Sequence, residues 1–538
     1  MSKSKKIIAI VLALILAFSV MAVPASALSL DSLSNLGGGS LENILYMVLE
    51  KLMNIVLTFL NKYWPGYQDR WDTVEDYAAE NFFPGEEKFE TEIADGAQWK
   101  AGYSGDSLLT GLDILGGDFW LAGTLEPIAG RVPVEILDDQ RVRVFALSDG
   151  VSGTVVYAAI DGFGFARGDV EEIRARFAEF AKKNDVISVN VSVLHQHSCI
   201  DTLGMNVPLV PALIVNTGNA AADGILDDYM ITKNKEFMEN LYNKTVNCMK
   251  KAVRNLKAGD LYYGSADITE LVHDKREPSV AENEINRLRF VPEDGSAETW
   301  ILEAAIHPTS FGAGPDFVTA DFPYYVEKSI NENDFANVVY IQGDELAITS
   351  DKSTTNVSDD RLENVTAYGN EIANRVRNIS NEEKLDPVLN VAHREVELSV
   401  DNQILTLATR EGIINAIIAK DGDGYVMKTE IGYMELGNNV AVFLVPGEAD
   451  PVIFKGGATS ADASWTGDTW DYAPLQEFTD CEHYMVCGLC NDQAGYILTD
   501  NEYHTLFTEN EEVNIVSRTS GSTITNAFIE LITDVKAA

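Results

Sequence analysis

Hydrophobic and polar positions alternate along the chain from residue 99 onward in a way that predicts strands and helices in turn. Residues 153–165 and 186–195 are apolar runs bounded by polar residues, which is typical of buried strands. Between them, residues 169–185 form a helix-like segment with Asp169 as its cap, acidic residues in its first turn and basic residues in its last. A strand, a helix and a strand in this order predict a βαβ unit with two parallel strands.

The alternation of predicted strands and helices continues towards the C-terminus. Three more apolar runs, each bounded by polar or turn residues, lie at residues 299–308, 337–344 and 438–448. Amphipathic helices are expected around residues 235–256 and 361–381. The pattern therefore predicts an α/β fold with a mixed, largely buried sheet flanked by helices.

The first residues have a different character. Residues 1–27 combine a basic start, an almost wholly apolar stretch and a small-x-small sequence that ends at Ala27. This combination predicts a secretory signal peptide cleaved near Ala27, and hence a secreted, extracellular protein. We expect residues 28–97 to form an N-terminal helical extension with an acidic linker, and residues 98–538 to form the main domain.

Residues 41–64 form a segment that is apolar nearly all round. Glu50 and Lys51 interrupt it, so that no apolar run reaches the roughly 20 residues that a membrane span needs. One interpretation is a buried or self-associating helix. The other is a helix that makes peripheral contact with a membrane or micelle, or guides an apolar substrate.

Charge and cysteine content narrow the range of partners. The formal net charge of −43 argues against a nucleic-acid partner, because phosphate binding requires positive charge. Five cysteines in a secreted chain allow one or two disulfides or free thiols. The sequence CEHYMVCGLC at residues 481–490 also allows a zinc knuckle, although its spacing lacks the second distant pair of such sites.

Polar and metal-binding residues collect where the predicted strands end. His195 and His197 end the strand at residues 186–195, and His307 ends the strand at 299–308. Glu448 and Asp344 follow two other apolar runs. Because sites in open α/β sheets gather at the carboxyl ends of strands, we expect an active site there.

The residue types at these ends point to zinc. Two or three imidazoles with a carboxylate form a donor set suited to Zn²⁺, and two histidines with one glutamate are a known catalytic arrangement. Alternate side chains of a strand share a face, so His195 and His197 are expected to face one site, one on the metal and the other moving protons. The alternative interpretation is that each histidine is an ordinary hydrogen-bonded residue at a strand end.

The segment HQHSCIDTLG at residues 195–204 resembles the His-x-His-Ser-Gly-Pro segment of the neutral/alkaline (non-lysosomal) ceramidases and their bacterial relatives. Further segments follow in the order of that family, and the resemblance covers about residues 99–538. These segments are WKAGYSGD, RVRVFALSDGVSGTVVYAAIDGFGF, DKREP preceding NRLRFVPEDG, AAIHPTSFG, VPGEADP and GLCNDQAGYILTDNEY.

The resemblance implies roles for individual residues. It implies one zinc ion per chain, with ligands at the matching positions His195, His307, Glu448 and Tyr496. It places His197 where the family's second histidine acts on water and on the leaving amine. Arg276 in DKREP lies where the family has its Asn-Arg motif, and is expected to orient the substrate.

The chain also departs from the family pattern. Cys199 and Ile200 stand where the family has Gly-Pro. The family's Gly-Asp-x-Ser-Pro-Asn motif corresponds to IQGDELAITSD, in which either Asp344 keeps the acidic position or Thr349 takes the place of the serine. We expect this chain to lack the C-terminal immunoglobulin-like domain of the better-known ceramidases.

Together these features predict a secreted zinc-dependent amidase that hydrolyses the N-acyl bond of ceramide or a related N-acylated lipid. Two alternatives remain at this point. One is a non-catalytic descendant of the fold that binds lipids or surfaces. The other is a hydrolase of different N-acyl amides or esters.

Overall fold

A computed structural model describes residues 74–537 except 118, 124–129, 207–233, 277–278, 313, 411, 423 and 504–513, together with residues 55, 57 and 58. The predicted signal peptide at 1–27 and nearly all of the predicted helix at 41–64 lie outside these residues. Within the described part of the chain, no helix combines the length and the apolar character that a membrane crossing requires.

The larger of the two main sheets has nine strands and is mixed. Its strands, in spatial order, are β11 (Ala336–Gln342), β9 (Glu298–Ala304), β8 (Glu284–Pro292), β6 (Lys257–Asp267), β1 (Lys100–Ser107), β3 (Arg141–Ser148), β4 (Thr154–Ile160) and β5 (Val186–Val193), with β13 (Glu383–Leu385) paired to β6. The pairs β11–β9 and β4–β5 are parallel and the remaining pairs are antiparallel.

The second main sheet has five strands. They are β14 (Leu389–Ser399), β16 (Gly424–Leu436), β17 (Val440–Leu444) and β19 (His483–Cys487), with β15 (Ile418–Asp421) paired to β16. Three two-stranded pieces complete the strands: β2 (Glu135–Ile136) with β10 (Phe317–Val318), β7 (Val272–Asp274) with β12 (Ile348–Ser350), and β18 (Glu448–Ala449) with β20 (Tyr496–Ile497).

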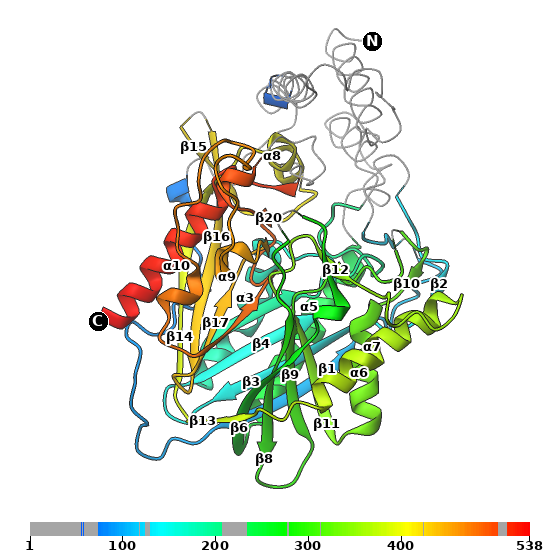
Figure 1. Cartoon of the computed structure of the whole chain (residues 1–538), viewed down its shortest axis with the longest axis vertical. Helices are drawn as coiled ribbons and strands as arrows, with labels where there is room; N and C mark the ends of the chain where they lie inside the picture. Colours follow the sequence, from blue (N-terminus) through cyan, green and yellow to red (C-terminus); the bar gives the residue numbers. More distant parts are fainter. Residues whose placement is uncertain are drawn as a thin grey trace.

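Helices cover the outer faces of the two packed sheets, which gives four layers (Figure 1). The larger sheet is covered by α3 (Arg167–Lys183), α5 (Lys235–Arg254), α6 (Asp321–Asn333) and α7 (Arg361–Arg377), and the smaller one by α10 (Ser520–Ala537). Two further helices, α8 (Gln403–Arg410) and α9 (Val452–Lys455), are short. Between the sheets, Phe145, Tyr157, Met434 and Val442 belong to one apolar core.

The predicted βαβ unit is confirmed. Strands β4 and β5 are parallel and α3 connects them. The prediction that Asp169 caps this helix is wrong, because the N-cap is Ala166 and Asp169 lies in the first turn. There the carboxylate of Asp169 accepts hydrogen bonds from the Tyr242 hydroxyl and the Asn415 amide. It therefore ties the helix to neighbouring segments instead of capping it.

The twist of the larger sheet decides where its strands end. Five of the six pairings between β9 and β5 are antiparallel, so hydrogen-bond topology alone would send these two strands in opposite directions. Adjacent strands rotate by roughly 20–25° each, and six steps turn the direction by roughly 120–150°. The sheet also curls, so that β11 lies against β3, β4 and β5. In Figure 1, β3 and β4 run across the view while β8 and β11 run down it. Twist and curl thus bring the carboxyl ends of β5 and β9 together.

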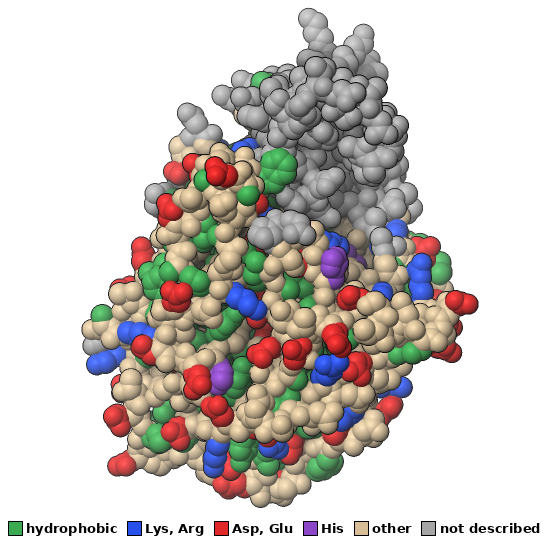
Figure 2. All heavy atoms as spheres, in the orientation of Figure 1, with side chains coloured by type: hydrophobic (Ala, Val, Ile, Leu, Met, Phe, Trp, Pro, Cys, Tyr) green, Lys and Arg blue, Asp and Glu red, His purple; other side chains and the backbone are tan. Residues whose placement is uncertain are grey.

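The negative charge of the chain is spread over the surface. Acidic side chains are scattered over the face shown in Figure 2, with lysines and arginines between them. Many acidic residues pair locally, as in the exposed pair Lys183 and Glu179 on α3. Exposed pairs of this kind contribute about 0–1 kcal/mol each to stability.

A buried ion cluster joins α3 to the second sheet. The side chains of Arg167, Arg174 and Glu430 are each 1% exposed, and both guanidinium groups bind the carboxylate. Arg174 donates from Nη1 to Oε2 at 2.8 Å and from Nη2 to Oε1 at 2.6 Å. Burial opposes ionisation of Glu430, but the two arginines outweigh it and lower its pKa from 4.5 to about 2.

We predict that Glu430→Gln destabilises the fold by about 3–5 kcal/mol at pH 7, because two buried guanidinium groups lose the buried carboxylate that both bind. The depressed pKa fixes the pH dependence. The ionised carboxylate stabilises the folded state fully above about pH 4.5, and this contribution is lost as the pH falls through about 2. Urea unfolding of wild type and variant at pH 7 and pH 3 measures both effects.

The matched control is Glu179→Gln on α3, the helix that carries both arginines of the cluster; it removes a carboxylate that is 93% exposed. We expect it to change the free energy of unfolding by less than about 0.5 kcal/mol. Equal effects of the two substitutions would show that the buried cluster does not join the layers.

Candidate metal centre

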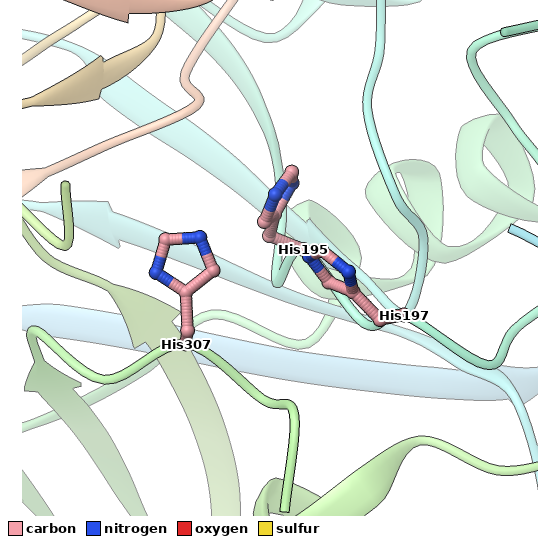
Figure 3. A group of neighbouring side chains, drawn as sticks. All are labelled: His195, His197 and His307. Atoms are coloured by element: carbon pink, nitrogen blue, oxygen red, sulfur yellow. The ribbon is translucent and has the colours of Figure 1, made fainter. Parts of the chain in front are cut away.

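Three segments that are far apart in the sequence bring His195, His307 and Glu448 together. His195 follows β5 by two residues, His307 follows β9 by three, and Glu448 begins β18, shortly after β17. The side chains of all three are almost fully buried. In Figure 3 the rings of His195, His197 and His307 lie next to one another, on segments that enter from different sides. The strand ends converge as the sequence pattern predicts.

The local backbone around His195 differs from the expectation. Strand β5 ends at Val193, and His195 has a φ of 61°, in the left-handed region that a non-glycine residue rarely adopts. The alternation of side chains along a strand therefore does not apply to His195 and His197. A turn places both rings in one site instead, with centroids 4.7 Å apart and planes at 81°. A strained conformation of this kind is typical of functional sites.

Backbone carbonyls fix the orientation of both imidazoles near Glu448. His195 Nδ1 lies 2.6 Å from the carbonyl oxygen of Phe163, whose ring also stacks on the imidazole with centroids 4.6 Å apart. His307 Nδ1 lies 3.0 Å from the carbonyl oxygen of Glu345 and 3.2 Å from that of Ile348. In the neutral rings these contacts place the proton on Nδ1 and leave a lone pair on each Nε2.

Glu448 lies between the two lone pairs. Its Oε2 is 3.5 Å from His195 Nε2 and 3.1 Å from His307 Nε2. Three electron-rich atoms facing one another in a buried site repel unless a cation lies among them. The donor set of two imidazoles and a carboxylate fits Zn²⁺.

The electrostatics of the cluster favour positive charge. Burial lowers the pKa of His307, but the carboxylates of Glu345 and Glu448 outweigh burial and raise it to about 9. In the metal-free protein a proton on His307 therefore supplies the positive charge, and a bound metal would replace it. The pKa of His195, by contrast, is held well below its usual value by burial and by the neighbouring His197 and His307.

His197 stands beside this cluster with its free nitrogen inward. Its Nδ1 is 3.2 Å from the carbonyl oxygen of Gly123, and its Nε2 is buried without a hydrogen-bond partner. Burial and the charge of His307 lower its pKa to about 3, so the ring is neutral at physiological pH. One ring nitrogen from each of His195, His197 and His307 lies within 4.8 Å of the other two. His197 is thus placed to accept a proton at the site.

Two residues at the site were missed by the sequence analysis. Glu345, whose buried oxygens have no hydrogen-bond partner, contributes an atom within 4.8 Å of ligand atoms of His195, His307 and Glu448. Gln493 donates from Nε2 to Glu448 Oε1 at 3.0 Å. The sequence offered one signal, which is that Glu345 directly follows Asp344 at the end of an apolar run.

Tyr496 and Thr349 lie next to ligand positions in the backbone. Tyr496 is paired directly with Glu448 across the β18–β20 ladder and is half-buried. Thr349 forms an isolated parallel bridge with His307, but its hydroxyl lies 3.3 Å from the carbonyl oxygen of His273, to which it donates. Its predicted part in catalysis thus stays a prediction.

Arg276 and Asp344 lie outside the group of histidines. Arg276 lines a cavity together with Asp450 and Glu502. Asp344 is fully buried, and burial and the charges of Glu282 and Glu303 raise its pKa well above its usual value. Among the described residues, Asp344 does not belong to the cluster that contains His195, His307 and Glu448.

The cysteines stand apart from the metal-binding groups. All five carry free thiols. Among the described residues, no cysteine belongs to a group of histidine, cysteine and acidic side chains that could hold a metal. The zinc-knuckle alternative at residues 481–490 therefore has no support. Cys199, near the histidine pair, donates from its thiol to the carbonyl oxygen of Gln196 at 3.3 Å. Burial raises the pKa of this thiol, which disfavours the thiolate that metals bind.

Comparison with known proteins identifies the fold. The sequence matches no protein-family profile and no curated protein sequence. The structure, however, is similar to that of a neutral ceramidase from Pseudomonas aeruginosa, with a TM-score of 0.60 and 13% identity over 81% of this chain and 74% of that chain. A structure of a ceramidase complexed with C2 gives a TM-score of 0.59 and 12% identity over 81% of this chain and 75% of that chain. The resemblance noted in the sequence is therefore confirmed at the level of the fold, which is that of the neutral ceramidases.

Proposed function

We propose that this chain is a zinc-dependent amidase that hydrolyses the N-acyl bond of ceramide or of a related N-acylated lipid. The products would be a free fatty acid and an amine such as a sphingoid base. One observation carries the proposal: Glu448 Oε2 faces the Nε2 atoms of two imidazoles whose ring protons are directed to backbone carbonyls. The shared fold with neutral ceramidases supports the choice of substrate.

Three described residues and Tyr496 would hold the metal. His195, His307 and Glu448 contribute the atoms that already face one another. Tyr496 is proposed as a further ligand from its place opposite Glu448 on β20. A zinc ion bound there lowers the pKa of water towards neutrality and polarises a carbonyl group.

His197 would move the proton that amide hydrolysis requires. Its neutral ring carries a buried lone pair on Nε2 and is held by Gly123 through Nδ1. It would take a proton from the attacking water and give it to the departing nitrogen when the C–N bond breaks. Gln493 keeps the carboxylate of Glu448 in place by donating to Oε1.

The proposed access to a lipid substrate rests on features of the sequence. The signal peptide at residues 1–27 would direct the protein out of the cell, where N-acylated lipids are accessible in membranes or micelles. The apolar segment at residues 41–64 would contact the lipid surface. Arg276 would orient the polar part of the substrate, as the resemblance implies.

We predict that His195→Ala and Glu448→Gln each lower zinc affinity by more than roughly 100-fold, beyond the 10–100-fold that outer-shell changes cause. Each removes an atom that faces the proposed metal. Both variants are expected to lose hydrolysis of ceramide. Zinc content of the purified protein, with release of fatty acid from ceramide, measures the two effects.

His273→Ala is the matched control, because His273 is an exposed histidine on β7 and belongs to no group of possible metal-binding residues among those described. It is expected to keep both zinc and activity. Full ceramide hydrolysis by zinc-free His195→Ala would contradict the proposal. If the wild-type protein binds lipid, but binds no zinc and cleaves no N-acyl substrate, it would instead be a non-catalytic descendant of the fold.

A second prediction tests the part of His197. Gly123 has a φ of 102°, and a Cβ added there would lie 2.0 Å from the carbonyl oxygen of His197. Gly123→Ala must therefore displace His197 and disturb its Nδ1 hydrogen bond. We expect kcat/KM to fall at least about 100-fold, the lower end of the effect of a general base, while zinc content stays unchanged.

Gly111→Ala provides the control for backbone strain. Gly111 has a similar φ of 93°, but an added Cβ would meet no atom within 4 Å. Activity should therefore remain near that of the wild type even if stability falls. If Gly123→Ala retained full activity with the wild-type pH profile, His197 would not be the proton-transferring group.

A further inference from the structure

Glu345 is a buried glutamate for which the proposed chemistry has so far given no role. It follows β11 in the sequence Gly343-Asp344-Glu345 and is 0% exposed. Neither carboxylate oxygen has a hydrogen-bond partner. An ionised carboxylate buried in this way costs several kcal/mol unless a positive charge or a donor compensates it.

The position of Glu345 shows where the compensation would come from. One of its oxygens lies within 4.8 Å of ligand atoms of His195, His307 and Glu448, which also lie within 4.8 Å of one another. Its Oε2 is 3.6 Å from His307 Nδ1, beyond hydrogen-bond distance. That nitrogen is directed to the backbone carbonyls of Glu345 and Ile348. The carboxylate is thus close to the centre but bonded to none of its members.

Charge balance adds an independent argument. An ionised Glu345 beside an ionised Glu448 would bring two negative charges into one buried cluster, and like charges at such distances repel strongly where water is excluded. Two neutral imidazoles, two carboxylates and one divalent cation form a neutral set. A divalent ion shared by both carboxylates therefore removes the repulsion and satisfies the orphaned oxygens together.

We propose that Glu345 is a further protein ligand of the metal, so that the centre of this chain combines two glutamates with the two histidines and Tyr496. The inference rests on the proposed zinc function and adds a donor to it. The neighbouring Asp344 is equally buried. Among the described residues, however, it belongs to no cluster of side chains that could hold a metal. The assignment is therefore specific to Glu345.

The test compares Glu345→Gln with Asp344→Asn, two isosteric changes at adjacent buried carboxylates. Competition with a chromophoric chelator measures zinc affinity, and the visible spectrum of the Co²⁺-substituted protein reports the set of ligands. Loss of a direct ligand predicts a fall in affinity of more than roughly 100-fold for Glu345→Gln, with a changed Co²⁺ spectrum. Asp344→Asn should leave the Co²⁺ spectrum unchanged and alter the affinity less than threefold, an order-of-magnitude bound of about 0.6 kcal/mol.

A second measurement on the wild-type protein covers the case in which Glu345→Gln fails to fold. Anomalous diffraction at the zinc edge should place a Glu345 oxygen about 2.0–2.2 Å from the ion. Unchanged affinity and Co²⁺ spectrum in Glu345→Gln, or a Glu345 oxygen more than about 3 Å from the ion, would overturn the assignment. Neither result would affect the proposed function as long as the wild type binds zinc through His195 and Glu448. A wild type without zinc would instead overturn the proposed function itself.

Discussion

The site depends on one carboxylate oxygen that faces two imidazole nitrogens. Glu448 Oε2 lies 3.5 Å from His195 Nε2 and 3.1 Å from His307 Nε2. His195 and His307 follow strands of the larger sheet, whereas Glu448 begins β18, shortly after β17 of the second sheet, so the site exists only when both main sheets are packed. Backbone carbonyls lie within hydrogen-bond distance of Nδ1 of both histidines, so each Nε2 faces the carboxylate. These acceptor atoms repel one another unless a cation lies among them, and the packing of the surrounding fold keeps them close.

The larger sheet contributes to this through its twist. In a flat mixed sheet β5 and β9 would point in opposite directions, and the histidines that follow them would lie at opposite edges. Right-handed twist over six pairings, together with the curl that brings β11 against β3, β4 and β5, turns the two strand ends towards each other. In parallel sheets, sites gather at the carboxyl ends of strands because these ends share one edge. Here the strand ends meet because a mixed sheet twists and curls.

Buried charge is a recurrent feature of this fold, and it is compensated in different ways. In the cluster of Arg167, Arg174 and Glu430, the carboxylate is compensated by direct ion pairing with both arginines between α3 and β16. The cluster of Glu345 and Glu448 has no cationic side chain bonded to Glu345, and compensation there falls to His307 or to a metal. The first arrangement holds layers together, whereas the second leaves negative charge available for a ligand. The left-handed backbone of His195 shows a similar priority of site over local stability.

The sequence by itself determined the α/β class, the βαβ unit of β4, α3 and β5, and the histidines and glutamate at strand ends, because periodicity and residue type are local properties. Only the tertiary structure decided that there are two packed sheets, that His195 leaves the strand conformation, and that Glu345 joins the cluster. Glu345 and Asp344 are adjacent and chemically alike, so no local pattern separates them. What separates them is which buried side chains lie within reach, and that is set by how the sheet twists and how the strand ends pack.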